Sequence, residues 1–196
     1  MAKTVPVRSP ARVLVLGPVA VASRDGLQAV RGQQGLILSM LAAAHPNPVT
    51  TEALIDELWP ERAPASARTA VRVVLTRLRE RLRSDEPVVV HRGGAYQLEL
   101  DDDQFDQLRF LRLLDRGAQV LPSDPERAVT QLRAALDLWR GDAYAPFYNT
   151  ARLQARAGYL EERRREAEEL LVSAFLDSGR SDSAATWATP LVEAEP

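Results

Sequence analysis

Residues 66–83 read SARTAVRVVLTRLRERLR, and their apolar positions recur with the period of an α-helix. At about 100° per residue, one side of this helix is a continuous apolar stripe, which a protein core has to cover. The stripe consists of Val71, Val74, Leu75, Leu78 and Leu82. The opposite side carries small and polar residues. The sequence therefore predicts a helix that is buried along one face and open along the other.

The open face of this helix is bordered by arginines. Its centre consists of Thr69, Val73, Thr76 and Glu80, with Arg68, Arg72, Arg79 and Arg83 along one edge and Arg77 and Arg81 along the other. In a DNA major groove, arginine binds phosphates or guanine, while threonine and valine contact thymine methyl groups. The same pattern also occurs on surface helices whose charges are simply solvated. The neighbouring elements have to decide between these two interpretations.

Positive charge is concentrated in the first half of the 196-residue chain. Residues 1–100 contain 13 basic and 9 acidic side chains, whereas residues 101–196 contain 12 and 18. Contact with a polyanion is therefore expected from the first half. The chain has no cysteine, no signal-peptide pattern and no apolar run of about 18 residues. We expect a cytoplasmic protein without disulfides, thiolate chemistry or a membrane segment.

Short strands and two helices are expected before residue 66. Strand-like segments occupy 12–21 and 27–30, and helical spacing covers 33–44 and 51–58. The Asp25-Gly26 turn between the strand-like segments predicts a small antiparallel sheet. Thr50 is the expected N-cap of the second helix, which stops before Pro60, and Ser66 is the expected N-cap of the third.

A β-hairpin is expected directly after the arginine-rich helix. Two strand-like segments within 87–100 flank Gly93-Gly94, which is a strong signal for a two-residue turn. The order is then a small sheet, three helices and a hairpin, which is the order of a winged helix-turn-helix. In that fold the third helix enters the major groove and the hairpin contacts the adjacent backbone or minor groove.

From residue 101 onward the sequence predicts a linker and then helices. The run Asp101-Asp-Asp103 is the expected linker, and the helices are expected at 105–120, 124–139, 152–176 and 182–194. Small residues at helical spacing after Ser/Gly/Pro turns indicate helix-hairpin repeats of the tetratricopeptide kind. The chain stops at Pro196 without a capping helix, so we expect it to be part of a longer protein.

Several segments together resemble the SARP family (Streptomyces antibiotic regulatory proteins). They are VLVLGPVAV at 13–21, LIDELW at 54–59, APASAR at 63–68, LTRLR at 75–79, GAY at 94–96, ALDLWRGD at 135–142 and YLEE at 159–162. Members of this family join an OmpR-like winged helix to a tetratricopeptide-like bacterial transcriptional activation domain. The resemblance implies a transcriptional activator that binds direct repeats upstream of a promoter as two side-by-side protomers and contacts RNA polymerase.

The resemblance and the element pattern agree on the architecture. We expect a flexible arm at 1–10, an α+β winged-helix DNA-binding domain at 11–101 and an all-α tetratricopeptide-like activation domain at 102–196. Gln33-Gln34-Gly35 stands where the family tends to have Lys or Arg, and Thr69-Ala-Val-Arg72 replaces its usual Asn-Thr-Leu-Gln. The operator sequence is therefore not predicted by the resemblance.

The expected DNA-binding residues lie on the third helix and on the hairpin wing. Those of the third helix are Arg68, Thr69, Arg72, Val73, Thr76, Arg77, Arg79 and Arg83, and those of the wing are His91, Arg92, Gly93 and Gly94. In OmpR-like domains the connector before the third helix faces RNA polymerase. The resemblance therefore implies polymerase contacts at Trp59, Glu61 and Arg62.

Enzyme signatures are not found in the sequence. It has no GxxxxGK[ST] phosphate loop, no GxGxxG after a strand and no HExxH motif, so we expect neither catalysis nor a cofactor or metal. One alternative function remains open, in which the winged helix no longer binds DNA and the helical half is a protein-interaction scaffold. The acidic second half favours that alternative.

Overall fold

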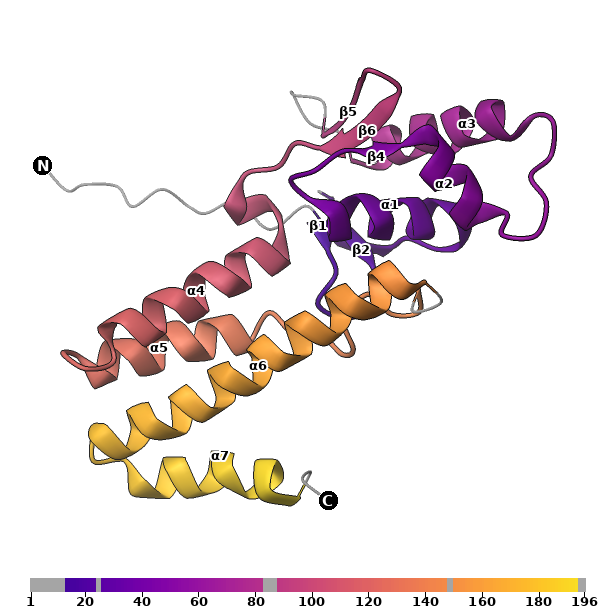
Figure 1. Ribbon diagram of the computed structural model, residues 1–196. Coiled ribbons are helices and arrows are strands. Elements are labelled where there is room, and N and C mark those ends of the chain that lie inside the picture. Colours follow the sequence, from indigo (N-terminus) through magenta and orange to yellow (C-terminus); the bar gives the residue numbers. More distant parts are fainter. Residues whose placement is uncertain (1–12, 24–25, 83–87, 148–149, 194–196) are drawn as a thin grey trace, which may run out of the picture.

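The computed structural model describes residues 13–23, 26–82, 88–147 and 150–193, in two parts that share one continuous hydrophobic core (Figure 1). The first part contains two three-stranded sheets and three helices, and the second part is helical. This is the predicted fold class, a winged helix followed by an all-α domain. The expected arm at 1–10 and Arg83 lie outside the described residues.

The first part has the element order of a winged helix-turn-helix. It consists of β1 (Val13–Leu14), β2 (Ala20–Ser23), β3 (Gly26–Ala29), α1 (Gly32–Ala44), β4 (Val49–Thr50), α2 (Thr51–Leu58), α3 (Ala67–Arg81), β5 (Val89–Arg92) and β6 (Ala95–Leu98). The first sheet has the order β1-β2-β3 and the second the order β4-β6-β5, with every pairing antiparallel. Strand β4 was not predicted, because two residues between helices carry no strand periodicity.

The predicted helix starts and the predicted apolar stripe are found in the structure. The Thr50 hydroxyl accepts a hydrogen bond from the Ala53 N–H at 3.1 Å and so caps α2. Ser66 occupies the N-cap position of α3, although its side chain makes no capping hydrogen bond. The stripe of α3 is buried throughout: Val71, Val74, Leu75, Leu78 and Leu82 are between 0% and 7% exposed. Burial of these side chains fixes which face of α3 points outward.

The second part is a set of antiparallel helices. It consists of the 3₁₀ turn η1 (Asp102–Gln104), α4 (Asp106–Val120), α5 (Pro125–Leu136), α6 (Ala151–Asp177) and α7 (Ser181–Glu193). Figure 1 shows α4 and α5 as a hairpin, with α6 crossing from the winged helix to the far end of this hairpin. Asp124 caps α5 by accepting from the Arg127 N–H at 3.0 Å, and Pro125 follows at the first helical position.

The acidic run at residues 101–103 is not the linker that was expected. Asp101 and Gln104 form a capping box around η1, in which the side-chain oxygen of each residue accepts a hydrogen bond from the backbone N–H of the other. Arg112 of α4 makes ion pairs with both Asp102 and Asp103. The run therefore fixes the start of α4, and the two parts of the chain are joined by ordered structure.

A buried carboxylate connects the two parts. Asp106, the first residue of α4, is fully buried and accepts hydrogen bonds from the backbone N–H groups of Val15 and Leu16 at 2.9–3.0 Å. The guanidinium of Arg140 lies 3.5 Å from the same carboxylate. Burial raises the pKa of Asp106 to about 6, while these N–H groups and Arg140 favour its charged form and lower the pKa.

The aromatic loop after α5 packs at the same junction. The Tyr144 N–H donates to the Val15 carbonyl at 2.7 Å, and the buried Tyr144 hydroxyl donates to Gln107 at 2.7 Å. Gln107 in turn donates to the Ala42 carbonyl of α1 at 3.1 Å. This loop thus ties α4 to the segment after β1 and to α1, so the two parts form one body.

Candidate nucleic-acid interface

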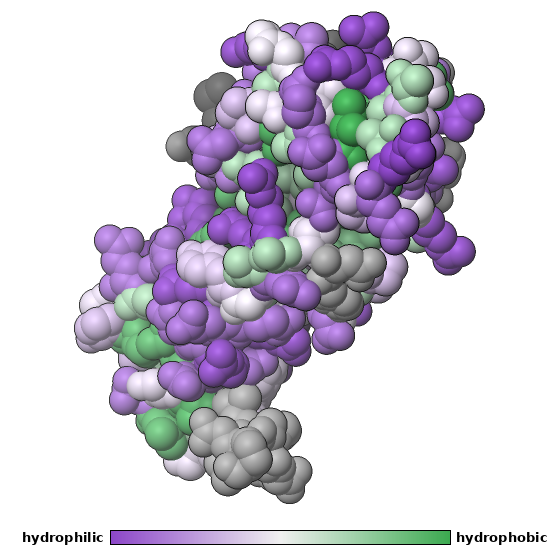
Figure 2. Space-filling view, turned by 45° about the vertical axis from the view of Figure 1, so that its right-hand side comes forward, coloured by the Kyte–Doolittle hydropathy of each residue, from purple (hydrophilic) through white to green (hydrophobic). Residues whose placement is uncertain are grey.

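The outward face of α3 is open to solvent. The predicted contact residues of this face that the structure describes are all exposed: Arg68, Thr69, Arg72, Val73, Thr76, Arg77 and Arg79. Val73, at the centre of the face, is 44% exposed although it is apolar. A major groove presents thymine methyl groups between two rows of phosphates. An exposed apolar side chain between guanidinium groups is complementary to that arrangement. Figure 2 shows that the visible surface of the first part is mostly hydrophilic with small hydrophobic patches.

Two of the predicted contact arginines of α3, Arg72 and Arg77, have no ion pair within the described part of the chain. Arg68, in contrast, binds the Glu52 carboxylate of α2. The hydroxyl of Thr76 donates to the Arg72 carbonyl within the helix at 2.9 Å, so its oxygen is left as an acceptor.

The first turn of α3 breaks an electrostatic preference of helices. A helix N-terminus carries partial positive charge and favours acidic residues, yet the first turn of α3 has no acidic residue and contains Arg68. Glu52 of the preceding helix supplies the missing carboxylate through its ion pair with Arg68. Residues that break local preferences are expected at functional positions, where a ligand makes use of them. An incoming phosphate at this helix end would meet both Arg68 and the helix dipole.

The wing turn is anchored to the start of α2. Gly93 and Gly94 have φ angles of 57° and 83°, the left-handed conformation that a two-residue hairpin turn requires and that glycine adopts without strain. The Gly94 carbonyl accepts from the backbone N–H of Thr51 at 3.1 Å and from its hydroxyl at 2.9 Å. The hairpin therefore has a fixed position relative to the helix-turn-helix. His91 and Arg92 beside the turn are exposed, and Arg92 pairs with Glu99 at 2.8 Å.

Arg79 links α3 to the wing. Its Nε donates to the Val89 carbonyl of β5 at 2.9 Å, and its guanidinium carbon lies 5.9 Å from the Tyr96 ring centroid. The His91 ring lies 4.5 Å from the same tyrosine ring on the other strand. Gly93 and Gly94 thus belong to a hairpin that is held directly against the recognition helix. Arg79 has this structural contact in addition to any contact with a phosphate.

The predicted polymerase-contact residues differ in their exposure. Trp59 ends α2 and is partly buried against the hydrophobic core, whereas Glu61 and Arg62 are exposed on the connector. Trp59 therefore anchors the connector, and its charged neighbours are the side chains that can reach another protein.

Sequence reasoning did not identify Thr51, Val89 and Tyr96 as parts of this site. Each acts through a contact between segments that are far apart in the chain: Thr51 with Gly94, Val89 with Arg79, and Tyr96 with Val49 in the β4–β6 pairing. No local sequence pattern indicates such contacts. The Gly94-Ala-Tyr96 segment was the available signal, because it marks where the hairpin turns.

Other classes of site are not found in the described part of the chain. Its His, Asp and Glu side chains include no group of three or more that could hold a metal ion. None of its helices is both long enough and apolar enough to span a membrane.

Two family models match consecutive parts of the chain. Residues 29–98 match the family described as "Transcriptional regulatory protein, C terminal", and residues 105–196 match "Bacterial transcriptional activator domain". The first match contains α1 to β6, and with them α3 and the wing. The second match contains the helices from α4 onward. Both family models thus describe parts of transcriptional regulators.

Similar proteins include Streptomyces regulators. Transcriptional regulator RedD of Streptomyces coelicolor is 35% identical over 87% of this chain and 51% of its own length. Regulatory protein DnrI of Streptomyces peucetius is 29% identical over 86% of this chain and 66% of its own length. The chain thus spans about half to two thirds of these relatives.

The fold is also that of a solved structure. Mycobacterium tuberculosis EmbR, in complex with a low-affinity phosphopeptide, superimposes with a TM-score of 0.81 over 92% of this chain and 50% of that chain, at 24% identity. This likeness establishes the arrangement of the winged helix and the helical part. Together, the two matched families in this order and the relatives RedD and DnrI show that the chain belongs to the SARP family of transcriptional regulators.

Proposed function

We propose that the winged helix binds double-stranded DNA, with α3 in the major groove and the β5–β6 wing on the adjacent backbone or minor groove. The observation that carries the proposal is the outward face of α3, which is open to solvent around Thr69, Val73 and Thr76 while the opposite stripe is buried. The DNA-binding domain then comprises residues 11–101 and the activation domain residues 102–196. Such a regulator acts in the cytoplasm.

The residues of the interface divide into two roles. Arg72 with Thr69, Val73 and Thr76 reads base edges, whereas Arg68, Arg79 and Arg83 hold phosphates and Arg92 anchors the wing. Arg68 and Arg92 each have a carboxylate partner in the free protein, with the Arg68 and Arg92 side chains 65% and 75% exposed. Exposed ion pairs contribute only about 0–1 kcal/mol, so exchanging a carboxylate for a phosphate costs little.

We propose that the DNA-bound protein activates transcription through a surface that contacts RNA polymerase. Two protomers bind side by side on direct repeats upstream of a promoter, and the exposed connector residues Glu61 and Arg62 contact the polymerase. The firm junction around Asp106 supports this arrangement, because it fixes the start of α4 relative to the first sheet of the winged helix. The double variant Glu61→Ala/Arg62→Ala should lower transcription in a purified system while leaving DNA affinity unchanged.

DNase footprinting on the promoters beside the protein's own gene tests the proposal. We expect two adjacent protected segments of the same orientation, spaced by about one helical turn or a multiple of it. A single or inverted protected segment would contradict binding to direct repeats. No protection on any fragment at low salt would contradict DNA binding altogether.

A protein-interaction scaffold is the second candidate function. It is favoured by the contacts that three interface arginines already make within the protein. Arg68 pairs with the Glu52 carboxylate, Arg79 donates to the Val89 carbonyl, and Arg92 pairs with the Glu99 carboxylate. The uncharged Gln33-Gln34-Gly35 at the start of α1 points the same way. The footprinting experiment separates the two functions, since a scaffold protects no DNA.

A further inference from the structure

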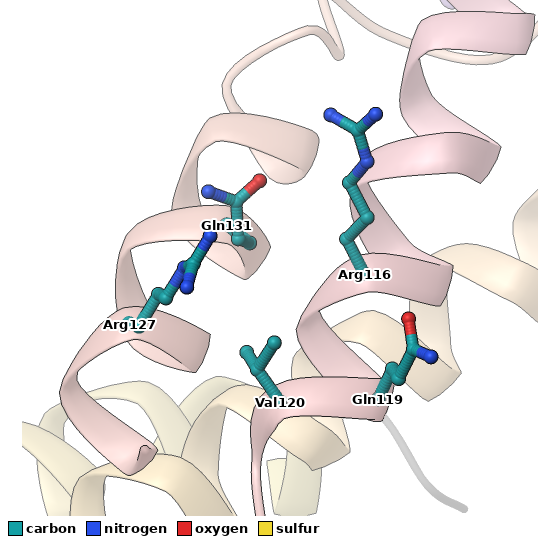
Figure 3. Close-up of a pocket in the computed structure, with 5 residues that line it drawn as sticks. All are labelled: Arg116, Gln119, Val120, Arg127 and Gln131. Atoms are coloured by element: carbon teal, nitrogen blue, oxygen red, sulfur yellow. The ribbon is translucent and has the colours of Figure 1, made fainter.

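A cationic hollow lies between α4 and α5, far from the proposed DNA-binding face. Its volume is about 350 Å³, and it is lined by Arg116, Gln119, Val120, Arg127 and Gln131. Figure 3 shows Arg116 and Val120 on one helix and Arg127 and Gln131 on the other, so the two guanidinium groups come from opposite walls. In Figure 1 the α4–α5 turn lies at the end of the helical part that points away from α3.

The two arginines of the hollow lack the partners that most arginines of the helical part have. Arg112, Arg140, Arg163, Arg164 and Arg180 make ion pairs, and Arg133 and Arg156 lie over aromatic rings. Among the described residues neither Arg116 nor Arg127 has an ion pair. No carboxylate lines the hollow either, although residues 101–196 carry more acidic than basic side chains. The hollow is thus lined by positive charge within the acidic half of the sequence.

The shape and lining of the hollow fit a peptide better than a small anion. Arg116 and Arg127 are exposed, and one ion pair at such a position contributes little, so useful affinity needs several contacts along an extended ligand. The carboxamides of Gln119 and Gln131 can both donate and accept, which matches the N–H and carbonyl groups of a peptide backbone. Val120 provides an apolar contact between them.

The walls of the hollow have a fixed spacing. Gly117 of α4 lies directly against Leu132 of α5, where an added Cβ would come within 2.6 Å of the leucine side chain. The neighbouring residues Arg116 and Gln131 are therefore held at a set distance across the hollow. A preformed site loses less entropy on binding than one that has to be ordered first.

We infer that the α4–α5 hollow is a docking site for an acidic, extended peptide segment of another protein. Carboxylates of the peptide pair with Arg116 and Arg127, and the two glutamines hold its backbone. Because the site lies away from α3, it stays accessible when DNA is bound. The inference does not depend on the proposed DNA binding.

The test is an NMR titration of the full ¹⁵N-labelled chain with acetylated and amidated hexaglutamate at about 50 mM salt, where exposed charges are weakly screened. Residue-resolved signals separate the hollow from the arginines of α3, which also attract anions. We expect saturable shifts of the Gln119 and Gln131 side-chain amides and of the backbone near Arg116 and Arg127. Inorganic phosphate at equal charge concentration should compete poorly.

Two charge-matched double variants complete the test. Arg116→Glu/Arg127→Glu should weaken binding at the hollow at least about tenfold, whereas Arg152→Glu/Arg165→Glu, which changes exposed arginines of α6, should stay within about twofold. Gln119→Ala/Gln131→Ala keeps the charge and should still weaken binding several-fold. Equal losses in both arginine variants, full competition by phosphate, or no shift at the glutamines would each overturn the inference.

Discussion

Arg79 of the recognition helix donates a hydrogen bond from its Nε to the Val89 carbonyl of the wing at 2.9 Å. The contact joins the two elements that we propose to bind DNA in different ways, α3 by base edges and the wing by the backbone. In the structure, an arginine of the α3 face thus positions the wing.

Replacing Arg79 should therefore loosen the wing. Arg79→Ala removes the hydrogen bond to Val89 and the contact with the Tyr96 ring, and we expect it to cost about 1 kcal/mol of unfolding free energy. Amide hydrogen exchange in β5 should accelerate, and DNA affinity should fall for all sequences alike. Arg81→Ala is the control, because it removes the same charge from the same helix without touching the wing. Equal exchange rates in the two variants would contradict the positioning role of Arg79.

Substitutions of two arginines on the α3 face should separate specificity from affinity. Arg72→Ala is expected to cost about 1–3 kcal/mol on the cognate site and to relax the preference at one base step. Arg68→Ala should weaken binding to cognate and scrambled DNA by the same factor, since a phosphate contact carries no sequence information. Competition binding with both DNAs measures the difference. Identical behaviour of the two variants would overturn the assignment of roles.

Gly35 in α1 should resist a substitution that normally stabilises helices. An alanine Cβ at this position would lie 2.3 Å from the Phe147 ring and 2.5 Å from the Val30 carbonyl. Gly35→Ala should therefore destabilise the protein by about 1–3 kcal/mol, as overpacking of a core does. Gly158 of α6 has no atom within 4 Å of an added Cβ, so Gly158→Ala should stabilise by about 0.5–1 kcal/mol. Urea unfolding of both variants measures these opposite signs.

The buried carboxylate of Asp106 should make stability depend on pH. Its pKa is raised from 3.8 to about 6 in the folded protein, so the folded state favours the protonated form. The contribution of Asp106 to the free energy of unfolding is fully present below the unfolded pKa and is lost as the pH rises through about 6. Between pH 4 and pH 7.5 this loss amounts to about 2–3 kcal/mol. His45 opposes this trend, because burial and Arg156 lower its pKa.

A comparison with Asp106→Asn isolates the contribution of this carboxylate. The variant lacks the titrating group and leaves the contribution of His45 unchanged, so its stability deficit relative to the native chain should shrink as the pH rises. A carboxyl carbon titration by NMR reports the pKa of Asp106 directly. A midpoint near 4 and a deficit that is constant with pH would contradict the effect of burial.

The sequence was sufficient for features that depend on neighbouring residues. The stripe from Val71 to Leu82, the cap at Thr50 and the Gly93-Gly94 turn are all found in the structure. Each is a local rule of helix periodicity, capping or backbone conformation. These rules placed α3 and the wing in the correct order, and with them the candidate site.

The features that the sequence missed depend on contacts between distant segments. The predicted helix over 124–139 ends at Leu136, because the chain then turns and the Arg140 N–H donates to the Leu16 carbonyl in the loop after β1. The junction at Asp106 and the contact between Arg79 and Val89 are likewise invisible in local patterns. Such contacts determine how rigidly the site is held, and the periodicity of apolar residues in the sequence contains no information about them.

The salt dependence of DNA affinity tests the central claim most directly. If α3 and the wing lie on DNA through Arg68, Arg79, Arg83 and Arg92, about four to five phosphates are neutralised. The logarithm of the association constant should then fall against the logarithm of salt concentration with a slope of about −4 to −5. The slope should become less steep by about one unit in Arg68→Ala. A slope near zero, or no binding to promoter fragments even at low salt, would contradict the account.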